Sequence, residues 1–171
     1  MRFLALLVEI NGNFVKKGKE SMGYIESNSA DRLKIPTPVT QDRLKDLFNQ
    51  RSWTWFVDNE GDLGGRWNGY TFYFLLTGTK QEILHILGGW GNPINPDRLP
   101  EARAFIADWH RKHLWPKVCS TLNDQGVVNI RVENTVDWES GATDEQLYQQ
   151  IDCALGTGMQ FFEALNEELS L

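Results

Sequence analysis

Three histidines are the residues of this sequence best suited to proton transfer or metal binding. His110 and His113 stand three residues apart in a segment with helical spacing, so both rings would lie on one side of a helix. Cys119 and His85 could in principle approach that pair as further ligands. A zinc site needs three or four protein ligands, and no third ligand stands at a fixed spacing from the pair. We therefore interpret His110 and His113 as solvated helix residues, and we predict neither a metal site nor another cofactor.

A second group that could do chemistry is acidic, because Asp58, Glu60 and Asp62 alternate in a short polar segment. A calcium-binding EF-hand loop starting at Asp58 would require Gly and Glu at the two positions where this chain has Leu63 and Gly69. A hairpin turn explains the three acids better. The sequence also contains no nucleophile elbow, phosphate-binding loop or dinucleotide fingerprint. These observations predict a protein without enzymatic activity.

The elements that would carry these side chains begin with a short helix. Thr40 is placed to cap its N-terminus, and Val39 and Leu44 are placed to make a hydrophobic contact across its first turn. After this helix, alternating aromatic and aliphatic residues predict strands over 53–57, 65–67, 70–76 and 83–87. Asn68-Gly69 is a strong hairpin signal. Connections this short make neighbouring strands antiparallel.

A second helix is predicted to follow a loop over 88–97. Pro100 suits the first turn of that helix, which must end near Trp115 because Pro116 disfavours helical geometry in the residue before it. Two further strands are expected over 117–122 and 127–132, with a turn between them.

The last helix has the clearest pattern. Thr143 and Gln146 can form a capping box at its start. Residues at steps of three and four then make an amphipathic stripe, namely Leu147, Ile151, Leu155, Gly158, Phe162, Leu165 and Leu169. Gly156 and Gly158 weaken a helix, so their presence indicates close backbone contact with the sheet or with a second copy of the chain.

This order of elements predicts an α+β fold with three helices on an antiparallel sheet: helix, three to four strands, helix, two strands, helix. The length of 171 residues fits one domain. We assign residues 39–171 to this domain and residues 1–38 to an N-terminal extension. Residues 3–10 would be a stray strand or a disordered tail rather than a leader. Purine-only codons can encode residues 16–20, as in a translated ribosome-binding site, which makes Met22 a candidate for the natural start.

The charge balance excludes the usual signature of a nucleic-acid binder. Lys and Arg number 17 against 23 Asp and Glu, for a net charge of -6, whereas nucleic-acid binders carry a basic face. The basic residues that do cluster fit a solvated helix face: Arg98, Arg103, Arg111, Lys112 and Lys117.

No stretch approaches the roughly 18–20 apolar residues that span a bilayer, so no membrane partner is predicted. Cys119 and Cys153 are too few for a disulfide framework, which favours a reducing, cytoplasmic location.

Several strings resemble the YbjN-domain family. Residues 109–117, Trp-His-Arg-Lys-His-Leu-Trp-Pro-Lys, resemble its "W-N-x-x-x-x-W-P-K" segment. Further resemblance lies in 61–64, 66–69, 141–147, 154–158 and 161–165, and the match keeps the family's order from about Thr40 to Leu169. It is similar to the actinobacterial branch, with one departure: His110 stands where the family usually has Asn. The resemblance implies a fold similar to type III secretion chaperones, frequent dimerisation, and a role as a sensory-transduction regulator.

Two functional hypotheses follow. The first is a non-catalytic regulatory or chaperone-like protein that binds an unidentified protein partner. Its candidate partner-binding residues are Trp90, Trp109, His110, Arg111, Trp115 and Lys117. The alternative is an enzyme, or a small-ligand or metal-binding protein, that uses the Gly88–Asp97 loop and His110, with Asp108 or Arg111 assisting. A buried polar pocket around His110 would favour the alternative, and a flat apolar-aromatic surface would favour the first hypothesis.

The strands predict self-association. Aromatic residues occupy both alternating sets, with Trp53 and Trp55 on one set and Phe56 on the other. A strand that is apolar on both sides tends to be buried on both faces. Helices can cover one face, so the second face requires a partner. We therefore expect a homodimer, since two-fold dimers are the commonest assembly of soluble proteins.

Overall fold

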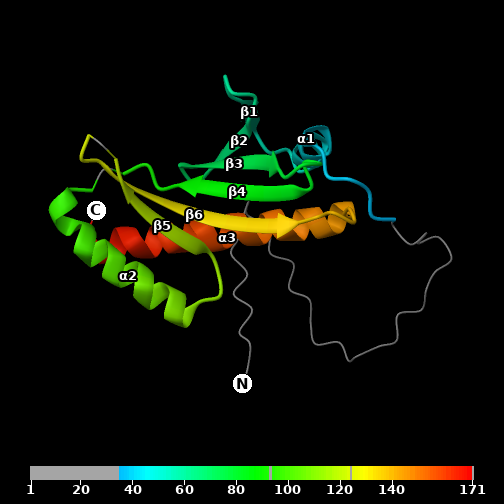
Figure 1. The fold of residues 1–171 in the computed structure, drawn as a ribbon. Coiled ribbons are helices and arrows are strands. Elements are labelled where there is room, and N and C mark those ends of the chain that lie inside the picture. Colours follow the sequence, from blue (N-terminus) through cyan, green and yellow to red (C-terminus); the bar gives the residue numbers. More distant parts are fainter. Residues whose placement is uncertain (1–34, 93, 124, 171) are drawn as a thin grey trace. The chain divides into compact units, whose positions relative to one another are not determined.

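A six-stranded antiparallel sheet and three α-helices form the part of the chain that this computed structural model describes, residues 35–92, 94–123 and 125–170 (Figure 1). The order is α1 (Gln41–Gln50), β1 (Trp55–Val57), β2 (Leu63–Trp67), β3 (Tyr70–Thr77), β4 (Ile83–Gly89), the 3-10 helix η1 (Pro96–Arg98), α2 (Leu99–Lys112), β5 (Lys117–Leu122), β6 (Val128–Asp137) and α3 (Asp144–Glu168). The strands lie in the order β1-β2-β3-β4-β6-β5. The predicted α+β class and element order are confirmed.

Most of the predicted N-terminal extension, 1–38, lies outside the described residues. The interpretations of residues 3–10 and of Met22 fall in that part. Where the description begins, Thr37 and Ala142 form an isolated antiparallel bridge, with N–H to O=C distances of 3.1 and 3.0 Å. This bridge ties the segment before α1 to the segment before α3.

The predicted helix starts are present with their hydrogen bonds. Thr40 accepts a hydrogen bond from the Arg43 N–H at 3.2 Å. At the start of α3, the Thr143 hydroxyl accepts from the Gln146 N–H at 3.2 Å, and the Gln146 side chain accepts from the Thr143 N–H at 2.8 Å. These contacts satisfy backbone donors that a helix leaves without an internal partner. Both capping predictions are confirmed.

The Asn68-Gly69 hairpin is also confirmed. Asn68 has φ 50° and Gly69 has φ 85°, the two positive values that a type I′ turn requires. The turn sets β2 against β3 with Trp67 opposite Tyr70, and the same register continues to Leu63 opposite Phe74. All the pairings of the sheet are antiparallel.

The core lies between one face of the sheet and the helices. Phe162 of α3 has its ring centre 6.3 Å from that of Phe72, and Phe48 of α1 has its ring centre 4.8 Å from that of Phe74. Phe72 and Phe74 are two residues apart in β3, so they point to the same face. α1 and α3 therefore cover the same face of the sheet, and α2 packs against α3 through Trp109. The stripe predicted for the last helix is buried at every position.

Two glycines explain how closely α3 approaches the sheet. A Cβ on Gly158 would lie 3.0 Å from both Phe72 Cε1 and Val132 Cγ2, and a Cβ on Gly88 of β4 would lie 2.5 and 2.6 Å from the same two atoms. Gly158 therefore makes the predicted close contact, and it makes it with the sheet. The second predicted glycine, Gly156, has no atom within 4 Å of its Cβ position and makes no such contact.

Some predicted boundaries were wrong. The loop predicted over 88–97 begins later, because Gly88 and Gly89 pair with both neighbouring strands as the end of β4. The strand predicted from Trp53 begins at Trp55, because the Trp53 N–H bonds to the Phe48 carbonyl at the end of α1 instead. β6 continues beyond its predicted end to Asp137, because its second half pairs with β4 while its first half pairs with β5.

The other face of the sheet has no helix over it among the described elements. Phe56, Tyr73, Leu75 and Leu87 lie on this face, since their positions alternate with those of the core residues. All four are half-buried, and the rings of Phe56 and Tyr73 meet edge to face at 5.8 Å. The described helices cover one face, as predicted, but the second face is apolar only over β1 to β4, because its positions in β5 and β6 include Lys117, Arg131 and Glu133.

Candidate functional site

The family-like segment 109–117 forms the corner between α2 and β5. Trp109 is buried in the last turn of α2, and the ring of His113 stacks on it with ring centres 3.8 Å apart. The Trp109 Nε1–H donates to the Trp115 carbonyl at 3.2 Å, and the Trp115–Pro116 peptide bond is cis. The first tryptophan of the motif thus fixes the backbone that carries the second.

His110 holds the start of the edge strand. Its Nε2 accepts a hydrogen bond from the Val118 N–H at 3.0 Å. Because Nε2 is the acceptor, the neutral ring carries its proton on Nδ1. Val118 belongs to β5, which is an edge of the described sheet, so this bond occupies a donor that would otherwise face solvent. An Asn at this position also offers an oxygen acceptor, which gives a physical reason for the residue that the family usually has there.

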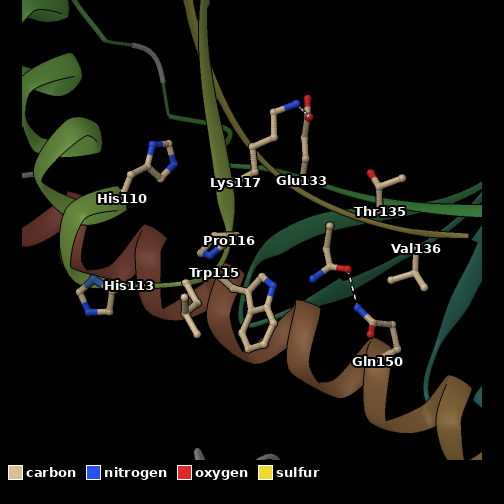
Figure 2. A pocket seen from close by; sticks show the side chains of 11 residues that line it. His110, His113, Trp115, Pro116, Lys117, Glu133, Thr135, Val136 and Gln150 are labelled. Carbon is tan, nitrogen blue, oxygen red and sulfur yellow. Dashed lines mark hydrogen bonds and ion pairs between the residues drawn. The ribbon is translucent and has the colours of Figure 1, made fainter.

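A groove of about 550 Å³ opens beside this corner (Figure 2). Residues from α2, β5, β6 and α3 line it: His110, His113, Leu114, Trp115, Pro116, Lys117, Glu133, Asn134, Thr135, Val136 and Gln150. A second hollow of about 340 Å³ shares Trp115 and Gln150 with it and adds Trp138 and Cys153. Trp115 and Gln150 therefore line both depressions.

Charged side chains in and near the groove are paired around two carboxylates, of which only Glu133 lines the groove. Glu133 is nearly fully buried, and it receives Lys117 Nζ at 2.6 Å and Arg131 Nε at 2.9 Å. Burial alone raises the pKa of Glu133, but the hydrogen bonds and charges of Lys117 and Arg131 outweigh it and hold that pKa below its ordinary value. Glu133 therefore stays ionised and acts as an anchor for two cations, which leaves it a poor proton donor at neutral pH.

The second carboxylate lies on α2. Asp108 binds Lys112 Nζ at 2.5 Å and Arg111 at 3.0 Å, and these two contacts lower its pKa. Unlike Asp108, Gln150 and Asn134 do line the groove: Gln150 Nε2 donates to Asn134 Oδ1 at 2.5 Å and joins α3 to β6. Figure 2 shows Lys117 reaching toward Glu133 and the separate dashed contact made by Gln150.

Exposed apolar side chains distinguish this corner from most of the surface. Leu114 is 79% exposed and Trp115 is 52% exposed, and both line the groove. A partner that covers a half-exposed aromatic side chain gains binding free energy, because aromatic residues bury the largest area per side chain.

The six candidate partner-binding residues differ in their exposure: two are buried and four are exposed. Trp90 and Trp109 are buried, at 3% and 7% exposure, and Trp90 bonds through its Nε1–H to Asn166 of α3 at 2.9 Å. The other four are exposed and stand in the α2–β5 corner: His110, Arg111, Trp115 and Lys117. Only these four can meet a partner in this conformation, and their role in binding stays a prediction.

Among the described residues, His110 and the Gly88–Asp97 loop line different hollows. Gly89 and Trp90 line a separate hollow of about 350 Å³ together with residues of β6, and His110 is not among its lining residues. His110 bonds to Val118, while Asp108 and Arg111 pair with each other, so the proposed catalytic partners are engaged elsewhere. Within the described ranges, no three His, Cys, Asp or Glu side chains gather as a metal site would require.

Sequence reasoning missed the polar half of the groove. Glu133, Asn134 and Gln150 were not among the predicted residues. The available signal was Asn134, a polar residue that stands in β6 at the same alternating phase as Val128, Ile130 and Val132. None of the helices in the described part of the chain is long and apolar enough to cross a bilayer.

Comparison with known proteins identifies the family. Residues 40–167 match the family YbjN, whose description is "Putative bacterial sensory transduction regulator". The crystal structure of YbjN from E. coli, described as "a putative transcription regulator", has a TM-score of 0.65 at 14% identity and covers 78% of this chain and 96% of that one. An uncharacterized protein from Methanothermobacter thermautotrophicus has a TM-score of 0.53 at 11% identity and covers 75% of this chain and 98% of that one.

At these identities the two structures show a shared fold and nothing more. No curated protein matches the chain. The family match spans most of the sequence and contains the corner, the groove and the last helix. The family description names a regulator and no enzymatic activity. The resemblance seen in the motifs is confirmed: the chain belongs to the YbjN family.

Proposed function

We propose that this protein is a non-catalytic, chaperone-like regulator that acts in the cytoplasm by binding another protein. One observation carries the proposal: Leu114 and Trp115 stand exposed at a groove whose polar side chains are fixed by hydrogen bonds and ion pairs. A rigid groove with an exposed aromatic at its rim supports partner binding, because little conformational entropy is lost when a partner docks. The groove's histidines and carboxylate are used for structure, which argues against catalysis.

The test is a comparison of captured proteins. The full chain and its Trp115→Ala variant would be used as baits in native lysate, and the bound proteins quantified by mass spectrometry. We expect at least one protein to be captured by the wild type and lost with Trp115→Ala. Leu122→Ala is the matched control, because Leu122 is equally exposed at 52% but lies at the far end of β5. Substrate turnover that His110→Ala abolishes would contradict the proposal.

We also propose that the chain forms a homodimer through the helix-free face of the sheet. The half-buried Phe56, Tyr73, Leu75 and Leu87 on that face support this. Light scattering should then give about twice the monomer mass of 19.6 kDa at micromolar concentration. Leu75→Lys should shift the mass to that of the monomer. A wild-type mass of 19.6 kDa at every concentration would contradict the dimer and leave the face free for a client protein.

A further inference from the structure

We infer that the free edge of β6 in this groove binds an extended segment of a partner protein, which joins the sheet there as a short additional strand. This inference rests on the proposed function, because it specifies how the partner binds at the same groove. The backbone groups that β6 exposes beyond the end of β5 determine the shape of the partner, and the side chains beside them determine its sequence.

β5 covers only half of one edge of β6. β4 pairs with β6 as far as Asp137, whereas β5 pairs with it only as far as Glu133. Figure 2 shows β5 turning away at Pro116 while β6 runs on past Thr135 and Val136. Both of these residues line the groove, which therefore lies on the side of β6 that β5 leaves free.

The alternation of the ladder shows which backbone groups point into the groove. In antiparallel pairing, consecutive residues direct their N–H and C=O groups toward opposite neighbours. At one end of β6 the Val127 carbonyl accepts from the Asn123 N–H on the β5 side at 3.0 Å, so the odd-numbered residues face β5. At the other end the Trp138 N–H donates to a carbonyl just before β4 at 2.9 Å, so the even-numbered residues face β4. Thr135 and Asp137 therefore direct their backbone groups toward the side that has no strand.

These backbone groups have no hydrogen-bond partner in the part of the chain that the structure describes. None of the bonds among those residues involves the N–H or C=O of Thr135 or Asp137, and both residues are exposed. The neighbouring edge differs, because His110 accepts the hydrogen bond of the outward Val118 N–H at 3.0 Å. A strand edge with free donors and acceptors is a template for pairing with another strand.

An extended backbone matches the spacing of this edge. Thr135 and Asp137 are two residues apart, about 7 Å along the strand, and each presents one donor and one acceptor. An extended peptide presents the same two groups at the same repeat along one of its sides. A phosphate of a nucleic acid or a lipid offers acceptors only, so it would leave the two carbonyls without a donor.

The length of the edge favours a segment over a second folded copy. Residues 134–137 span about 13 Å of strand. Stable interfaces between folded proteins bury about 1,200–2,000 Å², which is far more than so short an edge offers. The homodimer proposed above uses the helix-free face and leaves this edge open. An extended segment can enter the groove and add the contacts of its side chains to those of its backbone.

The side chains beside the edge specify the sequence of that segment. Val136 is half-buried and lines the groove together with Gln150 of α3 and the half-exposed Trp115. A residue that lies beside Val136 in the added strand points to the same helix side of the sheet, so it should be large and apolar. Its two neighbours point to the solvent side, where Thr135 and Asp137 are exposed, and can be polar. The segment has no proline where its N–H must pair.

The test is selection of random peptides of about a dozen residues on the immobilised full chain. We expect enriched peptides to place a large apolar residue between two polar residues. Fluorescence anisotropy then measures a synthetic copy of the most enriched peptide and its N-methylated forms, because an N-methyl group removes one backbone donor. Methylation of every second residue should weaken binding about ten-fold or more in one phase and leave it unchanged in the other.

Hydrogen exchange followed by NMR locates the binding site. In the free chain the Thr135 amide should exchange fast, while the Asn134 amide, which faces β4, should be protected. Saturating peptide should slow exchange at Thr135 by several-fold or more and leave Asn134 as it was. This measurement needs no variant, so it holds whether or not substitutions in β6 disturb the fold.

Variants of the chain separate backbone from side chain. Thr135→Pro removes the free N–H without removing a bond to β4, and it should weaken the peptide about ten-fold. Thr135→Ala keeps the N–H and should bind as the wild type does. Val57→Pro is the matched control on β1, the opposite edge of the sheet, where the N–H also points away from the neighbouring strand, and it should leave binding unchanged. Circular dichroism checks that each variant is folded.

Several outcomes would overturn the inference. They are a selection without enriched peptides, equal effects of the two methylation phases, and peptide binding that leaves the Thr135 amide unprotected. Protection of that amide in the free chain would assign the edge to a second copy if dilution removes it, and to another part of the same chain if dilution does not. A Trp115-dependent capture from lysate would keep the proposed function in each of these cases. Peptide pairing at Thr135 without such capture would contradict the proposed function instead.

Discussion

Phe162 in the middle of α3 and Trp115 at the α2–β5 corner are both large aromatic residues, yet the molecule uses them in opposite ways. Phe162 is fully buried against Phe72, and Trp115 is 52% exposed at a groove. Aromatic rings surround Phe162, namely those of Tyr70, Phe72 and Phe161. The groove at Trp115 is lined instead by hydrogen-bonded and charged side chains. Burial of apolar area therefore stabilises the core. At the corner, hydrogen bonds and ion pairs stabilise the structure around an apolar side chain that stays exposed.

The largest test of this contrast is truncation of each aromatic side chain. Phe162→Ala should lower the free energy of unfolding by about 3–5 kcal/mol, because it leaves a cavity at a fully buried position. Trp115→Ala should lower it by less than about 1 kcal/mol, because half of that side chain is already solvated. Urea denaturation followed by circular dichroism measures both. Equal costs would show that the corner is core, and a cost below about 1 kcal/mol for Phe162→Ala would place the α3 stripe on a surface.

A second test compares the two glycines of α3. Gly158→Ala places a methyl group 3.0 Å from Phe72 and Val132, and both neighbours are buried and unable to move freely. Overpacking of this kind costs about 1–3 kcal/mol. Gly156→Ala meets no atom within 4 Å and should stabilise the helix by up to about 1 kcal/mol.

Thermal unfolding of the two alanine variants gives the result directly. The variant at 156 should melt above the wild type and the variant at 158 below it. If both melted above the wild type, the sheet would have room to yield at Gly158, and the close approach of α3 would not be a packing constraint.

Local chemistry explains which parts of the fold the sequence predicts. Thr143-to-Gln146 capping and the Asn68-Gly69 turn involve residues that are adjacent in the chain, so their patterns determine their geometry. The insertion of β6 between β4 and β5 depends on contacts between distant segments, which no local pattern records. The predicted order of elements was therefore correct while the order of strands in the sheet was not predicted.

The same limit applies to the candidate site. Trp109 and Trp115 belong to one motif and are equally aromatic, and only the packing of α2 on α3 decides that the first is buried and the second exposed. The role of His110 depends on the Val118 N–H, a backbone group that carries no sequence signal. The sequence shows that aromatic and polar residues gather in the 109–117 segment. Which group each of them contacts is decided by the tertiary fold.

A third test concerns the corner's own stability. His110→Ala removes the acceptor for the Val118 N–H and should cost about 0.5–1.5 kcal/mol, as for a typical hydrogen bond. His110→Asn offers an oxygen in its place and should cost less than the alanine variant. Hydrogen exchange of the Val118 amide, followed by NMR, checks the mechanism, because protection should fall in His110→Ala and return in part in His110→Asn. Unchanged protection in His110→Ala would mean that another protein group, or exclusion of solvent, protects this amide.

The smallest effect is expected on the helix-free face, where His85 lies opposite Leu75 and Thr135. Burial lowers the pKa of His85 from 6.5, and the nearby charges of Lys117 and Arg131 act in the same direction against that of Glu133. The unfolded chain therefore takes up a proton more readily than the folded chain. Stability should fall as the pH drops through 6.5 toward the lower pKa of the folded state, and no such loss should come from this residue above pH 6.5.

The matched variant is His85→Gln, which keeps a polar side chain but does not titrate. We expect the wild type to lose more stability than His85→Gln between about pH 7.5 and pH 5.5, by a smaller margin than in the three tests above. Urea denaturation at the two pH values measures the difference. If the variant and the wild type lost the same amount, His85 would be solvated in the folded protein.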